Sequence, residues 1–181
     1  MKKILITGGC GFVGSTLALS FKTKYPDYQI FAFDNLKRRG SELNIPRLKS
    51  AGVEFIHGDI RSKEDFDDLP LVDLVIEAAA EPSVLAGLEG STGYLLNTNL
   101  QGTIHCLEFA RRSKASFIFL STSRIYPMTN IDQINYTEAA TRFVVDAHQT
   151  IPGVSMQGLS EQFPLEGSRS LYGASKLASE L

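Results

Sequence analysis

The sequence is poor in cysteine, in long apolar runs and in net charge, and each shortage excludes a class of protein. Its two cysteines, Cys10 and Cys106, are too few for a disulfide framework or a zinc site of their own. No apolar stretch approaches the roughly 20 residues that a membrane helix needs. A net charge of -2 offers no basic surface to nucleic acid or anionic lipid. We therefore expect a reducing, cytoplasmic setting, no metal site, and neither nucleic-acid nor membrane partners.

The composition is that of one globular domain. With 181 residues, 43% of them hydrophobic and 21% charged, the chain is long enough to bury a sizeable core. Its opening residues, Met1–Ile6, resemble the start of a signal peptide, but Gly8, Gly9 and Gly11 interrupt the apolar run. Because no cleavage site follows, we expect no secretion signal.

Strand and helix signals alternate along most of the chain. Strands are expected at residues 3–7, 29–33, 53–56, 73–76 and 116–120. Helices are expected near residues 13–21, 41–50, 96–107 and 171–181. The strand at 116–120 is apolar on both faces at its centre, as in a parallel sheet covered on both sides. The pattern predicts an α/β protein with a doubly wound, Rossmann-type parallel sheet.

A glycine-rich loop follows the first expected strand and precedes the first expected helix. Its glycines stand at a Gly-x-x-Gly-x-x-Gly spacing, which allows a tight turn and a close approach of a pyrophosphate to the backbone. Three glycines alone also suit a plain strand-to-helix turn, but this context favours a dinucleotide cofactor. The cofactor-binding residues expected here are Gly8, Gly11, Phe12, Val13 and Gly14.

The end of the second strand indicates which dinucleotide binds. Asp34 stands twenty positions after Gly14, where a carboxylate hydrogen-bonds the adenosine ribose and repels a 2′-phosphate. NAD is therefore expected rather than NADP. Lys37, Arg38 and Arg39 argue the opposite, and we interpret them as a solvated basic turn because Asp34 is nearer.

Two further groups follow the third and fourth strands. Asp59 suits either the adenine amino group or the cap of a helix. The small residues 78–80 would let the cofactor's ribose lie against the backbone, or would only pack at the start of a helix. The cofactor-binding residues expected after the three strands are Asn35, Asp59, Ile60, Ala78, Ala79 and Ala80.

Tyr172 and Lys176 stand four residues apart, on one face of the last expected helix. An ammonium group near a phenol favours the phenolate, which can take a proton from a hydroxyl group. The lysine can also hold the ribose of a nicotinamide. A lone Tyr-x-x-x-Lys is common by chance, but it gains weight beside the glycine loop.

Three stretches, Thr7–Gly14, Ser121–Tyr126 and Tyr172–Lys176, together resemble the extended short-chain dehydrogenases/reductases of the NAD-dependent epimerase/dehydratase family. The resemblance runs through the whole chain. Within the family, the sequence is most similar to the CDP-paratose (CDP-tyvelose) 2-epimerases. The stretches that carry this finer likeness are Ile6–Phe12, Phe33–Leu36, His57–Arg61 and Tyr136–Arg142.

The resemblance implies a catalytic set of Thr122, Tyr172 and Lys176, with NAD and a nucleotide-diphosphate sugar as ligands. Thr122 would bind the sugar oxygen being oxidised, Tyr172 would act as base, and Lys176 would orient the ribose. Dehydratases of the family carry Asp-Glu after this threonine, whereas this chain has Ser123 and Arg124, which are expected at the substrate. The implied activity is inversion of a sugar carbinol through a transient ketone, at C2 of a CDP-deoxyhexose. A reductase and a non-catalytic NAD-binding module remain as alternatives.

Residues 127–170 lack a clear period and form a longer interval than the family usually has. We interpret them as an inserted segment that borders the sugar site. Family members continue with further strands and a carboxyl-terminal substrate domain, so residues 1–181 are expected to be an incomplete NAD-binding domain, inactive alone. The resemblance also implies a homodimer formed through the long helix and the tyrosine–lysine helix. Asn99 resembles the family's helix asparagine, which supports the active-site region.

Overall fold

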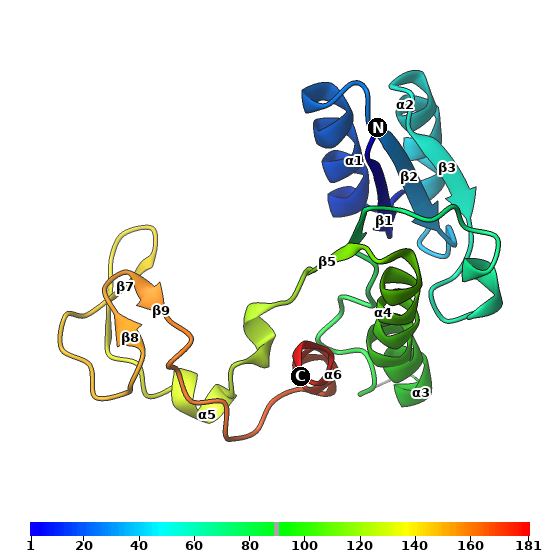
Figure 1. The fold of residues 1–181 in the computed structure, drawn as a ribbon. Helices are drawn as coiled ribbons and strands as arrows, with labels where there is room; N and C mark the ends of the chain where they lie inside the picture. Colours follow the sequence, from blue (N-terminus) through cyan, green and yellow to red (C-terminus); the bar gives the residue numbers. More distant parts are fainter. Residues whose placement is uncertain (89–90) are drawn as a thin grey trace.

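The computed structural model of the chain describes residues 1–88 and 91–181. At its centre lies a parallel sheet of five strands in the order β3-β2-β1-β4-β5 (Figure 1). The strands are β1 (Lys3–Thr7), β2 (Gln29–Asp34), β3 (Glu54–His57), β4 (Leu74–Glu77) and β5 (Ser116–Phe119). The predicted Rossmann-type fold is confirmed, and each predicted strand agrees with the structure to within one residue at either end. The strand order reverses between β1 and β4, which opens a crevice at their carboxyl ends.

Helices cover the two faces of the sheet and divide the core into two layers. The helices α1 (Phe12–Lys24) and α2 (Ile45–Ser50) bury Ala18 and Leu48 against Ile4 and Ile6 of β1. On the opposite face, α4 (Gly102–Ser113) packs over a cluster that includes Leu5. Because successive side chains point to opposite faces of a strand, β1 contributes to both layers of the core. Shorter helices are η1 (Ser41–Asn44), η2 (Glu64–Phe66), α3 (Thr92–Leu96) and η4 (Ser123–Ile125).

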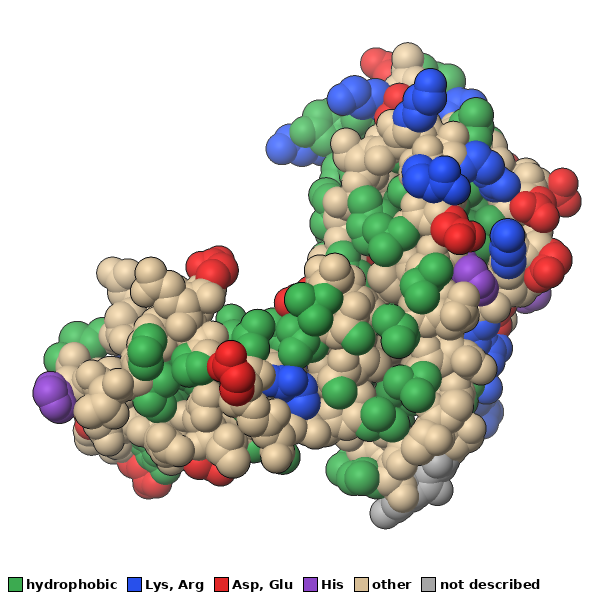
Figure 2. Space-filling model, turned by 60° about the horizontal axis from the view of Figure 1, so that its bottom comes forward, with side chains coloured by type: hydrophobic (Ala, Val, Ile, Leu, Met, Phe, Trp, Pro, Cys, Tyr) green, Lys and Arg blue, Asp and Glu red, His purple; other side chains and the backbone are tan. Residues whose placement is uncertain are grey.

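The long helix begins at α3, passes through a π-helical turn η3 (Asn97–Gln101) and continues as α4. Its buried face carries Thr103, Cys106 and Phe109. The apolar stripe visible in the sequence faces outward instead. The stripe consists of Leu96, Leu100, Ile104 and Leu107, of which only Leu100 is half-buried and the rest are exposed. Hydrophobic side chains are accordingly visible on the face of the molecule that holds α4 and α6 (Leu171–Glu180) in Figure 2.

The strand β5 forms one edge of the sheet. Phe117 packs toward α4, but Ile118 on the opposite face is 46% exposed. Coverage on both faces was predicted for this strand, and that prediction is wrong for β5. The reason is that α1 and α2 lie over the other half of the sheet, and nothing in residues 1–88 or 91–181 covers this face.

Residues 127–170 form a lobe that stands out from the sheet (Figures 1 and 2). The lobe contains α5 (Met128–Ile131) and two small hairpins, β6 (Tyr136–Glu138) with β7 (Phe143–Val145) and β8 (Val154–Ser155) with β9 (Gly158–Leu159). Phe163 is buried against Tyr126, with ring centroids 5.1 Å apart. These elements are too short to leave a periodic signal in the sequence.

No helix in the described part of the chain combines the length and the apolar character needed to cross a membrane.

The core of β1 should dominate the stability of the fold. Leu5 is 0% exposed at the centre of the sheet, whereas Leu43 on η1 is 76% exposed. We expect Leu5→Ala to lower the free energy of unfolding by about 2–5 kcal/mol, because it removes buried methyl groups and leaves a cavity. The matched control Leu43→Ala should change it by less than about 0.5 kcal/mol. Urea unfolding of the two variants measures the difference, and equal losses would contradict this view of the core.

Candidate functional site

A cavity of about 430 Å³ opens at the carboxyl ends of β1, β2 and β4, where the strand order reverses. It is lined by every residue that was predicted to bind the cofactor, except Tyr172 and Lys176. The lining residues foreseen from sequence are Gly8, Gly11, Phe12, Val13, Gly14, Asp34, Asn35, Asp59, Ile60, Ala78, Ala79 and Ala80. Those not foreseen are Phe33, Lys37, Arg38, Ser41, Gly58, Glu81, Pro82, Tyr94 and Thr98.

The glycine loop forms the floor of this cavity, and its shape depends on missing side chains. A Cβ atom on Gly14 would lie 2.1 Å from the carbonyl oxygen of Gly8. Gly8 itself has a positive φ of 63° and approaches the backbone of Ala79. The helix α1 follows Gly11 without a side-chain cap and without an acidic residue in its first turn. Its free N–H groups and positive end therefore suit a pyrophosphate.

Asp34 is fixed by two backbone groups at the next edge of the cavity. One carboxylate oxygen accepts the N–H of Cys10 at 3.0 Å, and the other accepts the N–H of Leu36 at 2.8 Å. Each oxygen keeps a lone pair for the hydroxyl groups of a ribose. Burial, aided by the charge of Asp34, raises the pKa of the Cys10 thiol to about 12, so this cysteine remains a protonated packing group.

Asp59 is bound within the protein. Arg61 donates to its carboxylate, with Nη2 2.5 Å from Oδ2, and Asn35 donates at 2.9 Å. Burial opposes ionisation of Asp59, but these hydrogen bonds outweigh it and hold its pKa at about 2. Asp59 also accepts the backbone N–H of Arg61 at 2.9 Å, whereas the next helix begins at Glu64. The alternative of a helix cap is therefore wrong for this residue.

Lys37 and Arg38 after β2 are exposed but line the cavity, whereas Arg39 is exposed and does not. Lys37 Nζ stands 4.4 Å from the ring centre of Tyr94, and Arg61 approaches the same ring at 5.1 Å. Arg38 forms an ion pair with Glu81 at 3.9 Å. The interpretation of a solvated turn is thus incomplete, because Tyr94 from α3 fastens this turn across the crevice.

The small residues after β4 lie in an extended loop against the glycine loop. Ala78 donates its N–H to the carbonyl of Thr7 at 3.2 Å. The next helix, α3, begins only at Thr92. The alternative that Ala78–Ala80 merely start a helix is therefore wrong, and their small size keeps the cavity open.

The predicted catalytic residues lie at η4 and on α6, two elements that pack against each other outside the lining of this cavity. Thr122 precedes η4, and its Oγ1 accepts the N–H of Arg124 at 3.2 Å. The helix α6 carries Tyr172 and Lys176, both buried, and packs on η4 so closely that a Cβ on Gly173 would lie 2.1 Å from the Arg124 carbonyl oxygen. Ser123 is exposed, as is Arg124. None of these residues lines the cavity described above.

Asn99, in the π-helical turn, links α6 to the edge of the cavity. Its Oδ1 accepts the N–H of Glu81 at 2.8 Å, and its Nδ2 donates to the Glu81 carbonyl at 3.1 Å. The same Nδ2 donates to Ser175 at 3.3 Å, and Ser179 donates to the Asn99 carbonyl at 2.8 Å. These hydrogen bonds give Asn99 the supporting position expected from its sequence context.

A Rossmann-type sheet with a glycine-lined crevice and an uncapped helix end at its reversal point defines a dinucleotide-binding protein. A profile of the NAD dependent epimerase/dehydratase family matches residues 4–181. The chain therefore belongs to this family, whose cofactor is NAD. The glycine cradle and the carboxylate of Asp34 at the edge of the cavity fit that cofactor.

Individual relatives agree with this placement. The CDP-paratose 2-epimerase of Salmonella typhi is 34% identical over 98% of this chain and 51% of its own length. The dTDP-D-glucose 4,6-dehydratase of Dictyostelium discoideum is 33% identical over 70% of this chain and 30% of its own. The solved UDP-Glc/GlcNAc 4-epimerase of Campylobacter jejuni has a TM-score of 0.74 at 25% identity, covering 99% of this chain and 47% of that one. The chain thus spans about half, or less, of the relatives that it matches.

Gly14 offers a direct test of the cofactor cradle. Gly14→Ala would push a methyl group into the Gly8 carbonyl, so we expect a loss of about 1–3 kcal/mol in unfolding free energy and weaker NAD binding. The matched control is Gly93→Ala on α3, where the nearest atom to an added Cβ is 3.6 Å away. Calorimetric titration with NAD and urea unfolding measure both effects. Unchanged NAD affinity in the Gly14 variant would contradict the assignment of the cradle.

Proposed function

We propose that the chain is the NAD-binding part of a nucleotide-sugar epimerase, acting at C2 of a CDP-deoxyhexose. The observation that carries this proposal is the match to a CDP-paratose 2-epimerase along 98% of the chain. The glycine-lined crevice, together with Tyr172 and Lys176 on α6, supports it. We place the activity in the cytoplasm, which suits the free, buried thiols of Cys10 and Cys106.

The proposed catalytic side chains have separate roles: one transfers the proton, and the others bind the substrate and the cofactor. Bound NAD supplies a site that accepts a hydride from the sugar carbon and returns it to the other face. Tyr172 takes the carbinol proton as general base and gives it back on reduction. Thr122 hydrogen-bonds the same oxygen, while Lys176 holds the nicotinamide ribose.

The residues after Thr122 favour epimerisation over dehydration. Elimination of water needs an acid and a base next to the sugar, and Arg124 keeps its proton at all ordinary pH values. Ser123 and Arg124 are exposed on η4, where we propose that they contact substrate oxygens. The lobe of residues 127–170 joins η4 to α6, and we propose that it borders the sugar.

One observation favours a different function, a non-catalytic NAD-binding module. The cavity does not include Thr122, Tyr172 or Lys176 among its lining residues.

A reductase of the same family would use the same three residues and differ only in its net reaction.

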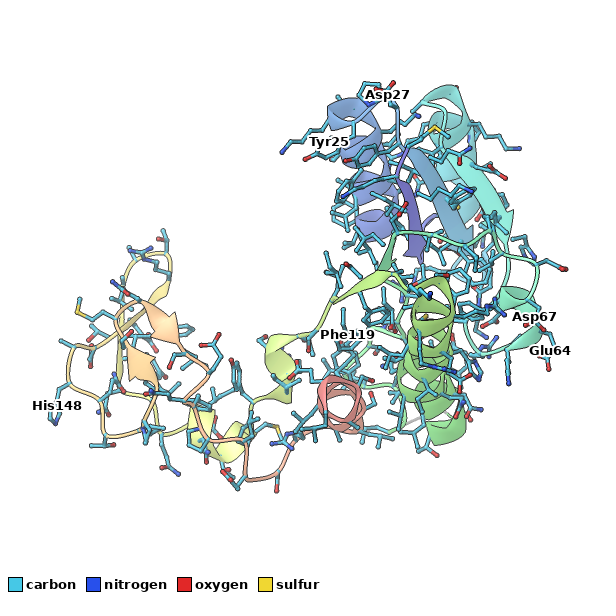
Figure 3. All side chains as sticks on the ribbon, viewed as in Figure 1. Tyr25, Asp27, Glu64, Asp67, Phe119 and His148 are labelled. Carbon is cyan, nitrogen blue, oxygen red and sulfur yellow. The ribbon has the colours of Figure 1, made fainter. Side chains whose placement is uncertain are left out.

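Tyr172→Phe tests the epimerase in the protein made from the complete reading frame that contains residues 1–181. We expect kcat for inversion of CDP-paratose to fall by at least about 100-fold, because the general base is lost. NAD affinity should stay within about twofold, since the phenyl ring retains its packing. Tyr25→Phe, at the far end of α1 (Figure 3), is the control and should change neither quantity.

Other outcomes separate the alternatives. Consumption of reduced cofactor with net product would identify a reductase, and intact NAD binding without any turnover would identify a non-catalytic module. Residues 1–181 alone should bind NAD without measurable epimerisation. Robust turnover by these residues would contradict the expectation that they are inactive alone.

The outward stripe of the long helix supports a homodimer. Ile104 and Leu107 are exposed on α4, next to α6, and an apolar stripe of this kind is buried when two helix pairs meet. We expect Ile104→Glu to convert the dimer to monomer, because a carboxylate would be buried without a partner. Sedimentation velocity measures the change, with Leu43→Glu as the exposed control. A monomeric unmodified protein would refute the proposed dimer.

A further inference from the structure

Glu77 is a buried carboxyl group whose second oxygen has no partner. It ends β4, an otherwise apolar strand, and is 1% exposed. Its Oε1 accepts a hydrogen bond from Thr103 Oγ1 at 2.7 Å. Its Oε2 is buried and makes no hydrogen bond within residues 1–88 and 91–181. Leaving such an atom unpaired is costly, which suggests that the group serves a purpose besides packing.

Lys176 stands beside this carboxyl group. Phe119 of β5 is the direct neighbour of Glu77 across the sheet, and Lys176 Nζ lies 3.7 Å from the ring centre of Phe119. Figure 3 shows Phe119 between the end of β5 and α6. Lys176 is only 2% exposed, and in the described part of the chain no carboxylate lies within 4.0 Å of its ammonium group. Lys176 therefore lies over the strand next to Glu77, and its ammonium nitrogen is more than 4.0 Å from the carboxylate oxygens.

Burial disfavours the charged form of both groups, whereas the charge of each group favours the charged form of the other. Burial raises the pKa of Glu77 to about 7, against the Thr103 hydrogen bond and the charge of Lys176. Burial lowers the pKa of Lys176 to about 8, against the charges of Glu77 and Glu180. The remaining titratable neighbours are the Cys106 thiol, whose pKa is raised by burial and by Glu77, and Tyr172, one turn away on α6.

We propose that Glu77 is a positioning residue for Lys176, whose ammonium group it holds charged and in place over Phe119. The role rests on the proposed function, in which Lys176 holds the ribose of NAD. A lysine buried against an aromatic ring alone would tend to lose its proton, and the carboxylate opposes this loss. Thr103 fixes one oxygen of Glu77 and leaves the other for the lysine.

The direction of the pH effect follows from these charges. Glu77→Gln keeps an acceptor for Thr103 but removes the negative charge, so Lys176 releases its proton more readily. An opposite charge at this range shifts a pKa by about one unit or more. If the pKa of Lys176 drops by one unit from about 8, its charged fraction at pH 8 drops about fivefold. NAD affinity at pH 8 should then fall by up to about fivefold relative to the unmodified chain, with little change at pH 6.

The experiment follows Lys176 directly in the 181-residue chain. Carbon-13 NMR of the lysine Cε groups gives its titration midpoint, and the Lys176→Met variant identifies the signal. We expect Glu77→Gln to lower the midpoint by about one pH unit and Glu180→Gln to lower it less. If Glu77→Gln does not fold, Thr103→Val serves instead. Loss of the Thr103 hydrogen bond raises the pKa of Glu77, so Glu77 is charged less often and the titration midpoint of Lys176 should again be lowered. An unchanged midpoint in a folded variant would overturn the proposal.

Calorimetric titration with NAD at pH 6 and pH 8 tests whether the charge of Lys176 affects NAD binding. A lowered midpoint with an unchanged pH dependence of NAD affinity would overturn the positioning role. Failure of the unmodified chain to bind NAD at either pH would instead refute the proposed function, and this role with it. The two failures are therefore distinguishable in one set of measurements.

Discussion

Backbone packs directly against backbone where β1 ends, and both the crevice and the helix behind it depend on this contact. Gly14 has room for no more than a hydrogen beside the Gly8 carbonyl, and a Cβ atom on Gly9 would lie 2.5 Å from the Cα atom of Ala32 in β2. This packing brings the first turn of α1 to the carboxyl ends of three strands at once. The positive helix end and the carboxylate of Asp34 then line one cavity, where they suit the pyrophosphate and the ribose hydroxyl groups of a dinucleotide.

The sheet and most of the crevice could be predicted from sequence because their signals are local. Each central strand is a short apolar run, and the spacing of Gly8, Gly11 and Gly14 specifies a turn that few other functions require. Asp34 and Ala78–Ala80 follow their strands immediately, so knowledge of the strand ends also locates them. In a parallel sheet, residues that follow neighbouring strands meet at the same edge.

The remaining features depend on contacts between distant parts of the chain. Tyr94 reaches the cavity only because α3 lies across it, and Asp59 accepts a hydrogen bond from Asn35, which lies 24 positions earlier in the chain. Glu77 gave one local signal, a charged residue closing an apolar strand, but its meaning depends on Lys176, almost a hundred positions later. The apolar stripe of the long helix predicted a helix correctly without telling which way Ile104 would face, because periodicity reports a contact surface and not its partner.

The edge position of β5 has a consequence for how the molecule associates. Its backbone pairs with β4 on one side, and within residues 1–88 and 91–181 no strand pairs with its other side, next to the exposed face of Ile118. An edge strand with unpaired backbone groups can pair with a strand from another chain. Natural proteins usually prevent this with charged side chains, proline or a β-bulge on the edge strand. Ser-Phe-Ile-Phe offers none of these, so this edge suits the addition of a further strand, from the same protein or from another chain.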